Sequence, residues 1–312
     1  MNLVELTPGT YHLQGGSNIG LSVQDDRALL IDAGLDGDTA KRALRVIDDL
    51  GVTLEAVFIT HAHADHFGGA YLLQERVTGV RLYAPALEAG MMEHPLIEPL
   101  YLFSGASPIR ELRGKFTLAE PCRVDQVIDK PGPLAIGPFE VDVVPLPGHA
   151  PRQIGVGVGD VLFCADALFP AKTLDKHQVI FCVDLDEALE TLERLPGLPY
   201  AHFAPGHGPA YRAGDEIARI CAANRTRLTE IRALVHEALA TLRRMPRRMP
   251  RETSALVAAV SDHYGLHLKT ATAYFLTRTT ILAALSSLER KGEVETLVRG
   301  NRLYWQRVDS QA

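Results

Sequence analysis

Residues 61–66 form the segment His-Ala-His-Ala-Asp-His, which places four side chains with metal-binding atoms within six positions. The apolar run AVFIT precedes the segment and predicts a buried strand that delivers the chain to His61. His61 and His63 stand two positions apart, so their imidazoles can converge on one ion from an extended backbone, and Asp65 and His66 can reach a neighbouring ion. Burying four such groups without partners would cost several kcal/mol. Because zinc accepts imidazole nitrogen and carboxylate oxygen, the segment predicts a metal site.

Three later segments carry the same kinds of side chain, each after a strand-like run. His149 follows VDVVPLPG, Asp166 follows VLFCA, and His207 lies in PGHGP after YAHFA. One such residue alone would usually be structural, but together, at strand ends and in this order, they complete the first segment. We therefore expect a set of seven metal-binding residues: His61, His63, Asp65, His66, His149, Asp166 and His207.

The motif series His-x-His-x-Asp-His, Gly-His, Asp and Gly-His resembles that of the metallo-β-lactamase superfamily, and the resemblance covers residues 8–212. It implies an α/β fold, the αββα sandwich, with two divalent metal ions at one edge. It also implies a division of the ligands that the spacing alone does not give. Zinc is the metal expected first, with iron or manganese as alternatives. In the implied division, His61, His63 and His149 bind the first ion, Asp65, His66 and His207 bind the second, and Asp166 bridges both.

Such a site predicts a hydrolase, because a water between two cations loses a proton near neutral pH and becomes a nucleophile. We expect Asp65 to carry the proton and the substrate to be a small ester, a thioester or a lactone-like molecule. Asp32 is a candidate to orient one of the ligands, with a turn cap as the alternative role.

Departures from particular branches of the superfamily narrow the substrate class. Zinc β-lactamases of the commonest class carry cysteine where this chain has Asp166, and the quorum-quenching lactonases have tyrosine where it has Phe169. Glyoxalase II resembles the core, and three basic residues after Asp166 could hold a carboxylate or phosphate, or could form a solvated loop. A metal-dependent ribonuclease or other phosphodiesterase and a mono-iron enzyme like the persulfide dioxygenases are the alternatives. The three basic residues are Lys172, Lys176 and His177.

Residues 1–214 are predicted to form the catalytic domain. Residues 21–34 predict a hairpin, and Asp38 is expected to cap a following helix that ends at Gly51. Residues 154–169 repeat the strand–turn–strand pattern, which suggests two similar sheets packed together. Residues 86–131 are irregular and rich in proline, with Pro95, Pro99, Pro108 and Pro121 among them, and predict either an ordinary packed excursion or a lid or pocket wall.

Residues 215–245 predict a connecting helix and a basic linker, because apolar residues recur at helical spacing until prolines interrupt them. Residues 246–312 predict three helices and a two-stranded ribbon that turns at Gly300-Asn301, an order that resembles a winged helix–turn–helix. In that domain we expect Ile281, Leu285 and Leu288 to define a buried helix face. The opposite face would carry a thin basic surface of Arg278, Thr279, Ser286, Ser287 and Arg290.

The net charge of −6 is divided unevenly, since residues 241–312 hold 12 Lys and Arg against 6 Asp and Glu and the rest holds 20 against 32. This asymmetry keeps nucleic acid as a partner under consideration, but the acidic metal domain would repel a polyanion. We favour a role for the last domain in forming a homodimer or a lid. A binding protein with a sensor metal is the third hypothesis, and the complete ligand set argues against it. The linker arginines are Arg243, Arg244, Arg247, Arg248 and Arg251.

The four cysteines are scattered and form no C-x-x-C pair, so we expect reduced and mostly buried thiols. No apolar run approaches the roughly 20 residues of a membrane helix. The first residues lack the basic and apolar regions of a signal peptide, and we expect a cytoplasmic protein with no membrane partner.

Overall fold

The computed structural model describes residues 1–240 and 250–308. Its first sheet contains seven strands in sequence order, antiparallel from β1 to β4 and parallel from β4 to β7. The hairpin predicted over residues 21–34 is present as β3 and β4. The strands are β1 (Asn2–Thr7), β2 (Thr10–Gln14), β3 (Ile19–Gln24), β4 (Arg27–Ile31), β5 (Thr53–Phe58), β6 (Arg81–Pro85) and β7 (Gln126–Ile128).

The second sheet contains six strands in the order β13-β12-β11-β10-β9-β8. All neighbours are antiparallel except β11 and β12, which run parallel. The second predicted strand–turn–strand unit is present as β10 and β11. The strands are β8 (Gly132–Ile136), β9 (Phe139–Pro145), β10 (Ile154–Val158), β11 (Val161–Ala165), β12 (His202–Pro205) and β13 (Tyr211–Arg212).

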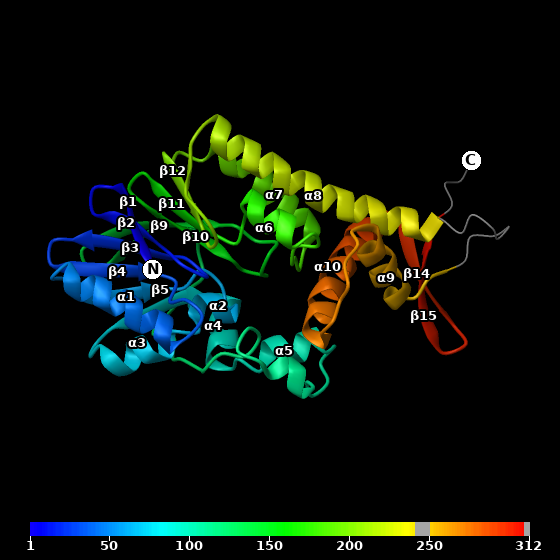
Figure 1. The fold of residues 1–312 in the computed structure, drawn as a ribbon, viewed down its shortest axis with the longest axis horizontal. Coiled ribbons are helices and arrows are strands. Elements are labelled where there is room, and N and C mark those ends of the chain that lie inside the picture. Colours follow the sequence, from blue (N-terminus) through cyan, green and yellow to red (C-terminus); the bar gives the residue numbers. More distant parts are fainter. Residues whose placement is uncertain (241–249, 309–312) are drawn as a thin grey trace.

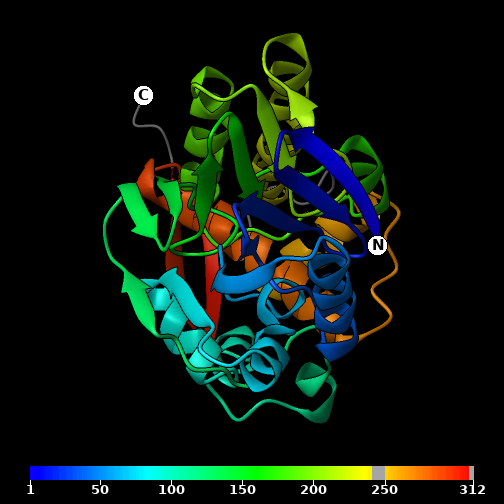
Figure 2. The ribbon, with the colours of Figure 1, turned by 90° about the vertical axis from the view of Figure 1, so that its left-hand side faces the viewer.

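The central strands carry apolar side chains on both faces. One face of each sheet packs against the other sheet, and the opposite face packs against helices. Leu29 and Ile31 of β4 and Phe163 of β11 belong to the core between the sheets. Leu30 and Leu162, one position along, belong instead to the cores under the helices. Burial of one such side chain stabilises the fold by about 1.5–3 kcal/mol. Helices α1 (Gly37–Asp49) and α3 (Ala70–Arg76) cover the first sheet, and α7 (Leu185–Arg194) and α8 (Asp215–Ala240) cover the second (Figures 1 and 2). The αββα sandwich is therefore confirmed.

The start of α1 differs from the prediction. The residue that caps it is Asp36, whose carboxylate accepts a hydrogen bond from the backbone N–H of Thr39 at 3.0 Å. Asp38 lies in the first turn and pairs with Lys41, so the prediction that Asp38 caps the helix was wrong. The backbone decides between the two aspartates, since Asp36 is extended, with φ −159° and ψ 173°, as a cap requires. Gly51 follows the helix with φ +71°, as predicted.

Residues 86–131 form a packed excursion with short helices. It contains α4 (Ala86–Glu93), α5 (Ile97–Leu102) and the 3-10 turn η1 (Arg110–Arg113). Met92, Leu102 and Leu112 are buried, which accounts for the apolar content of this stretch. Its far end reaches the C-terminal region, where the Phe103 and Phe275 rings lie 5.3 Å apart.

Within residues 250–308, the structure has two helices where the sequence predicted three for residues 246–312. Residues 250–308 contain α9 (Thr253–His263), α10 (Ala271–Arg290) and the ribbon of β14 (Val294–Arg299) and β15 (Arg302–Arg307). The long helix α8 packs against both α9 and α10 and thus supplies the third helix of the group (Figure 1). The ribbon turns at Gly300 and Asn301, both with positive φ, as predicted. The linker arginines 243, 244, 247 and 248 lie outside the described residues.

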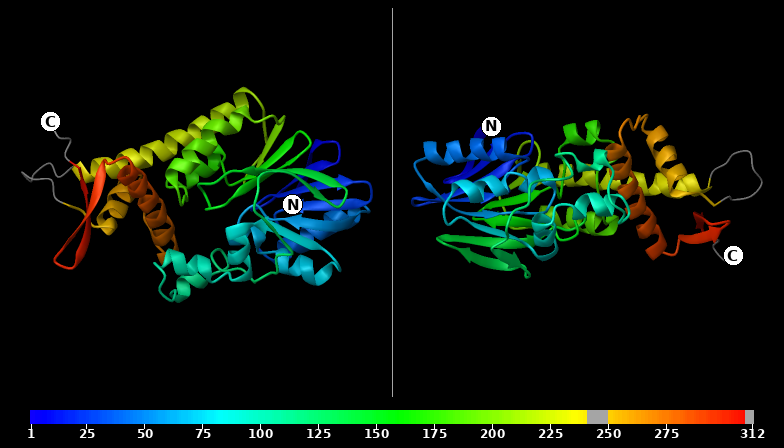
Figure 3. Two further views of the ribbon diagram at one scale, coloured as in Figure 1. Left: turned by 180° about the vertical axis from the view of Figure 1, so that it is seen from behind. Right: turned by 90° about the horizontal axis from the view of Figure 1, so that it is seen from below.

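Helix α10 is joined to the sandwich on both sides. Ile281, Leu285 and Leu288 are buried as predicted, in the same core as residues of the second sheet. Ser287 and Arg290 were both predicted to face outward; this was wrong for Ser287, which is buried, and is confirmed for Arg290, which is exposed. Ser287 donates to Asp186 of α7 at 2.7 Å. Helix α10, drawn in orange in Figure 3, packs against α7. Arg290 contacts Asp184 and Asp186 at 2.9 and 2.8 Å.

Two further expectations concern the chain as a whole. All four cysteines are buried and free, as expected for reduced thiols. Among the helices of residues 1–240 and 250–308, none combines the length and the apolar character that crossing a membrane requires.

We predict that Asp186→Asn lowers the free energy of unfolding by about 1–2 kcal/mol at pH 7, because the carboxylate joins Ser287, Arg290 and Lys291 to α7. Burial raises the pKa of Asp186, but these three partners outweigh it and lower the pKa to about 2. The stabilisation is therefore complete above the ordinary value of 3.8 and is lost as the pH falls toward 2.

Urea unfolding from pH 7 to pH 2 measures this effect. Asp175→Asn is the control, because this carboxylate is exposed and makes no ion pair within the described residues. Equal midpoints for Asp186→Asn and wild type at pH 7 would contradict the prediction.

Candidate metal centre

The first four predicted ligands lie where β5 leaves the first sheet. After Phe58, the chain passes through His61 and His63 and enters the short helix α2 (Ala64–Phe67), which carries Asp65 and His66. Gly68 and Gly69 follow because α2 packs against the backbone of residues 33–35. A Cβ atom on Gly68 would lie 2.0 Å from the carbonyl oxygen of Leu35, and one on Gly69 would lie 2.4 Å from that of Ala33.

The other three predicted ligands come from the second sheet. His149 follows β9, Asp166 follows β11 directly, and His207 follows β12. All four strands that lead to the site end at the same edge of the sandwich. This is where carboxyl ends of strands commonly present functional side chains.

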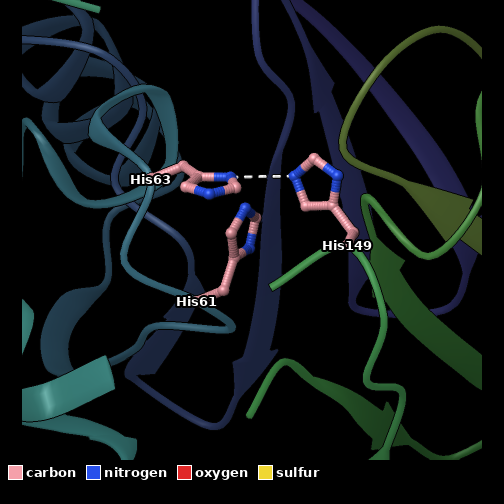
Figure 4. Close-up of side chains that lie close together, drawn as sticks. All are labelled: His61, His63 and His149. Carbon is pink, nitrogen blue, oxygen red and sulfur yellow. Dashed lines mark hydrogen bonds between the residues drawn. The ribbon is translucent and has the colours of Figure 1, made fainter. Parts of the chain in front are cut away.

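The structure brings all seven predicted residues together. Their ligand atoms form three overlapping groups, each with all atoms within 4.8 Å of one another. Figure 4 shows the first group, with His61 and His63 from the loop after β5 opposite His149 from the loop after β9. The Nδ1 atom of His63 lies 2.8 Å from Nε2 of His149. The groups are His61, His63 and His149; Asp65, His66 and His207; and His61, His66 and Asp166.

Asp166 lies between the first two groups. Its Oδ1 atom is 3.4 Å from Nε2 of His66, and its Oδ2 atom is 3.6 Å from Nε2 of His149 and 3.4 Å from Nε2 of His207. Gly206 makes this approach feasible, because a Cβ atom there would lie 2.2 Å from Oδ1 of Asp166.

Hydrogen bonds on the outer side of the site fix the histidine rings. Asp32 accepts from Nδ1 of His66 at 2.8 Å, so the sequence-based hypothesis that Asp32 orients a ligand agrees with its position. Thr60 lies 3.0 Å from both Nδ1 of His61 and the Asp32 carboxylate. A hydrogen bond from the outer nitrogen leaves Nε2 of each ring free to face the site.

The turn between β2 and β3 supports the second group. Ser17 donates to Oδ2 of Asp65 at 2.8 Å, and the carbonyl of Gly16 accepts from Nδ1 of His207 at 2.9 Å. Neither residue was identified from the sequence, although the Gly-Gly-Ser-Asn turn at residues 15–18 is the kind of segment that can hold a ligand from its backbone.

Two buried glutamates from the 86–131 excursion also lie near the site and were missed from the sequence. Glu88 accepts hydrogen bonds from the backbone N–H groups of Ala62 and Arg152, so it holds the two ligand-bearing loops together. Burial, followed by the charges of Asp65 and Glu88, raises the pKa of Glu98 well above its usual value. The excursion thus contributes directly to the surroundings of the site.

The electrostatics divide the histidines into two classes. Burial, with the neighbouring imidazoles, lowers the pKa of His61 well below its usual value and that of His63 to about 3. Burial acts in the same direction on His66, but the carboxylates around it outweigh burial and raise its pKa. The Asp166 carboxylate is the main cause that raises the pKa of His207 to about 10. The site therefore favours ionised carboxylates and cationic partners.

The residues fit a metal ion. Three buried atoms that face the site have no hydrogen-bond partner within the described residues: Nε2 of His61, Nε2 of His66 and Oδ1 of Asp166. Nε2 of His66 and Oδ1 of Asp166 lie 3.4 Å from one another as an ion pair without a hydrogen bond, and Nε2 of His61 has no hydrogen-bond partner in the described part of the chain. A buried polar atom without a hydrogen bond costs about 1–3 kcal/mol, and a metal ion bound by these atoms would offset that cost. Imidazole nitrogens and carboxylate oxygens form a donor set that suits zinc, iron or manganese.

Aromatic and basic side chains surround the ligands. The ring of Phe181 contacts His63 and His149 at centroid distances of 5.2 and 5.6 Å, and that of Phe169 stacks on His207 at 6.3 Å. The basic residues predicted near the site lie on and after α6 (Ala171–Lys176) and are exposed.

We predict that wild-type protein binds about two metal equivalents and that Gly206→Ala binds fewer, because the added methyl group displaces Asp166 and His66. Elemental analysis after zinc loading and gel filtration measures the stoichiometry. Gly197→Ala is the matched control, since a Cβ atom there meets no atom within 4 Å. Equal stoichiometry in Gly206→Ala and wild type would contradict the placement of the second group.

Known proteins share the sequence and the fold of this chain. Hydroxyacylglutathione hydrolase from Albidiferax ferrireducens is 34% identical over 152 residues, which are 48% of this chain and 47% of that protein. The chain thus spans about half the length of this curated relative. A probable metallo-hydrolase from Bacillus subtilis is 26% identical over 62% of this chain and 85% of its own length.

Solved structures match over nearly the whole chain. A β-lactamase domain protein from Burkholderia ambifaria has a TM-score of 0.72 at 20% identity, covering 98% of this chain and 94% of its own. A metallo-β-lactamase family protein from Thermus thermophilus has a TM-score of 0.71 at 19% identity, covering 97% and 100%. These likenesses show the shared fold. The sequence model of the metallo-β-lactamase superfamily matches residues 13–207, which include all seven site residues. The chain therefore belongs to the metallo-β-lactamase superfamily and has the fold of its hydrolases.

Proposed function

We propose that this protein is a dinuclear, metal-dependent hydrolase of small esters, thioesters or lactone-like molecules, with glutathione thioesters as the first class to test. The observation that carries the proposal is the convergence of buried ligand atoms of His61, His66 and Asp166, none of which makes a hydrogen bond within the described residues. Two ligand groups with the Asp166 carboxylate between them suit a pair of ions better than a single one.

The proposed ligand division is the one that the family resemblance implies, and two of the three groups support it. His61, His63 and His149 would hold the first ion, with Asp166 between the two positions. The second ion would be held by Asp65, His66 and His207. Zinc is the metal we propose, with iron or manganese as alternatives.

Two such ions would supply a hydroxide near neutral pH and polarise the carbonyl of the substrate. Asp65 would accept the proton of the attacking water, and Ser17 orients this carboxylate by its hydrogen bond to Oδ2. The rings of Phe169 and Phe181 present an apolar wall beside the histidines and exclude bulk water there.

Two lysines that follow Asp166 favour a substrate that carries a carboxylate, whereas the lowered pKa of His177 favours its neutral form. Lys172, Lys176 and His177 lie after Asp166, and the charge of His207 contributes, after burial and Lys176, to the lowered pKa of His177. His177 therefore lies near the second ligand group. Glutathione has two carboxylates, and relatives named for hydroxyacylglutathione hydrolysis match about half of this chain. Phe169 lacks the hydroxyl that would assist a lactone, so a thioester is the better candidate.

We also propose that residues 1–214 form the catalytic domain, that 215–245 connect, and that 246–312 form a winged-helix-like domain. The order α9, α10, β14 and β15 supports this assignment, with α8 as the remaining helix and Arg251 bridged to Trp305 beside the ribbon.

We predict that the zinc-loaded protein hydrolyses a hydroxyacyl-glutathione thioester faster than a lactone, a phosphodiester or RNA. Asp65→Asn and His149→Ala are expected to reduce turnover to below a few per cent, because each removes a ligand, while circular dichroism stays unchanged because both lie outside the strands. His267→Ala, an exposed histidine, is the control and should keep full activity.

A variant that retains more than a few per cent of wild-type turnover would contradict the role of that residue. One equivalent of tightly bound iron, with no hydrolysis of any of the four substrates, would favour the mono-iron dioxygenase alternative instead.

We predict weak nucleic-acid binding at physiological salt. Arg290 and Ser287, two members of the expected basic surface, are engaged with Asp184 and Asp186, which leaves fewer donors for phosphates. Fluorescence anisotropy with RNA and DNA measures the affinity. Sub-micromolar binding with a steep salt dependence, lost when the five linker arginines are replaced by alanine, would support the nuclease alternative.

A further inference from the structure

Thr280 of α10 is a buried hydroxyl that bonds to the sandwich rather than to its own helix. Its Oγ1 atom donates to the carbonyl of Ile180 at 2.9 Å and accepts from the backbone N–H of Cys182 at 3.2 Å. The side chain has no exposed surface. The hydroxyl of Thr280 therefore fixes the backbone on both sides of Phe181. Phe181 precedes Thr280 by 99 positions in the sequence.

Phe181 holds the first ligand group in two ways. Its carbonyl oxygen lies 3.1 Å from Nδ1 of His149 and accepts the proton of that nitrogen, which leaves Nε2 free for a metal ion. Its ring packs edge-on against His63 and His149, with interplanar angles of 75° and 77°. A shift of Phe181 would therefore move two of the three histidines in the group shown in Figure 4.

The segment that follows Phe181 also holds the backbone beside His149. The carbonyl of Gly148 accepts hydrogen bonds from the N–H groups of Val183 and Asp184 at 2.9 and 3.0 Å and from Sγ of Cys182 at 3.3 Å. The residues from Ile180 to Asp184 therefore hold both the ring and the main chain at His149.

We propose that Thr280 is a positioning residue for the first metal position, so that the C-terminal helix α10 sets the affinity of His61, His63 and His149 for their ion. This inference rests on the proposed dinuclear function. The physical reason is that hydrogen bonds behind a ligand fix its ring and tautomer, and losing them costs about 10–100-fold in metal affinity. The second group has its own supports, Asp32, Ser17 and Gly16, so its affinity does not depend on Thr280.

Two other residues of α10 separate this role from simple docking. Ser287 bonds to Asp186 and attaches α10 to α7 without contact to Phe181 in the described hydrogen bonds. Thr279, the neighbour of Thr280, bonds to the carbonyl of Phe275 within its own helix. Ser287→Ala therefore tests docking, and Thr279→Val tests the loss of a threonine hydroxyl from this helix.

The test compares Thr280→Val, which keeps the shape and removes the hydroxyl, with Thr280→Ser, which keeps the hydroxyl. Zinc affinities of both positions are measured by competition with a chromophoric chelator, and the cobalt-substituted forms are compared by visible absorption. Thr280→Val is expected to weaken zinc binding at the position of His61, His63 and His149 by about 10–100-fold and to leave the other position unchanged. The visible spectrum of cobalt at the weakened position is expected to change as well. Thr280→Ser, Thr279→Val and Ser287→Ala are expected to bind as wild type does.

Unchanged zinc affinities in a folded Thr280→Val protein would overturn the inference while leaving the proposed function intact. An equal loss in Ser287→Ala would overturn it too, because docking alone would then explain the effect. If Thr280→Val does not fold, Thr280→Ala makes the same test without a buried methyl group beside unpaired backbone atoms. A wild-type protein that binds no metal would instead show that the proposed function fails.

Discussion

The burial of charged and polar ligand atoms at the edge of the sandwich is the constraint on which the rest of the structure depends. Asp166 is 5% exposed, and His61 and His66 are not exposed at all. Removing a carboxylate from water costs several kcal/mol even in real proteins, so it must be offset by nearby positive charge and fixed dipoles. Within the chain, burial opposes ionisation of Asp166, but His207 and His66 outweigh it and lower the pKa of Asp166 well below its usual value. Divalent cations bound by these atoms would replace the protons on His66 and His207 as the positive charge beside Asp166. The strands already hold the ligand atoms close together, so binding would need little movement.

This constraint explains local features that would otherwise be unfavourable. Asp32 and Ala165 adopt positive φ, 67° and 45°, although neither is glycine. Each stands at the end of a strand that leads to the site, and such strain, about 1–3 kcal/mol per residue, persists only where surrounding contacts fix it. Asp32 is fixed by Thr60 and His66, and Ala165 is followed directly by Asp166. The ends of β4 and β11 thus have equivalent roles in the two sheets, which agrees with the repeated strand–turn–strand pattern of the sequence.

The resemblance of the motif series to the superfamily was sufficient to predict the sandwich, and ligand spacing after strand-like runs was sufficient to predict that the seven residues lie together, because both signals are local in the sequence. The sequence was insufficient where two residues fitted the same local role equally well. It was also insufficient where the hydrogen-bond partner of a side chain lies far away in the sequence. Asp36 and Asp38 are both suitable helix caps, and only the extended backbone at Asp36 distinguishes them. Ser287 and Arg290 fit the pattern of exposed polar residues on a helix face. Their partners, Asp184 and Asp186, come from a much earlier part of the chain, and no periodicity connects the two segments. Apart from Asp32, the residues that support the ligands were missed for the same reason.

The extent of the hydrophobic core suggests why a C-terminal region would influence a site whose ligands all come from the sandwich. One core continues from the second sheet through α7 and α8 into α9, α10 and the ribbon, and includes Leu162, Leu192, Ile281 and Trp305. Displacing α10 would expose apolar surface on both sides, so the two parts of the chain stabilise one another. The backbone at Phe181 lies at this contact, between Thr280 on one side and His149 on the other. The core fixes α10, Thr280 of α10 fixes the backbone at Phe181, and the carbonyl of Phe181 fixes the ring of His149. Packing of α10 therefore helps to keep this ligand in place.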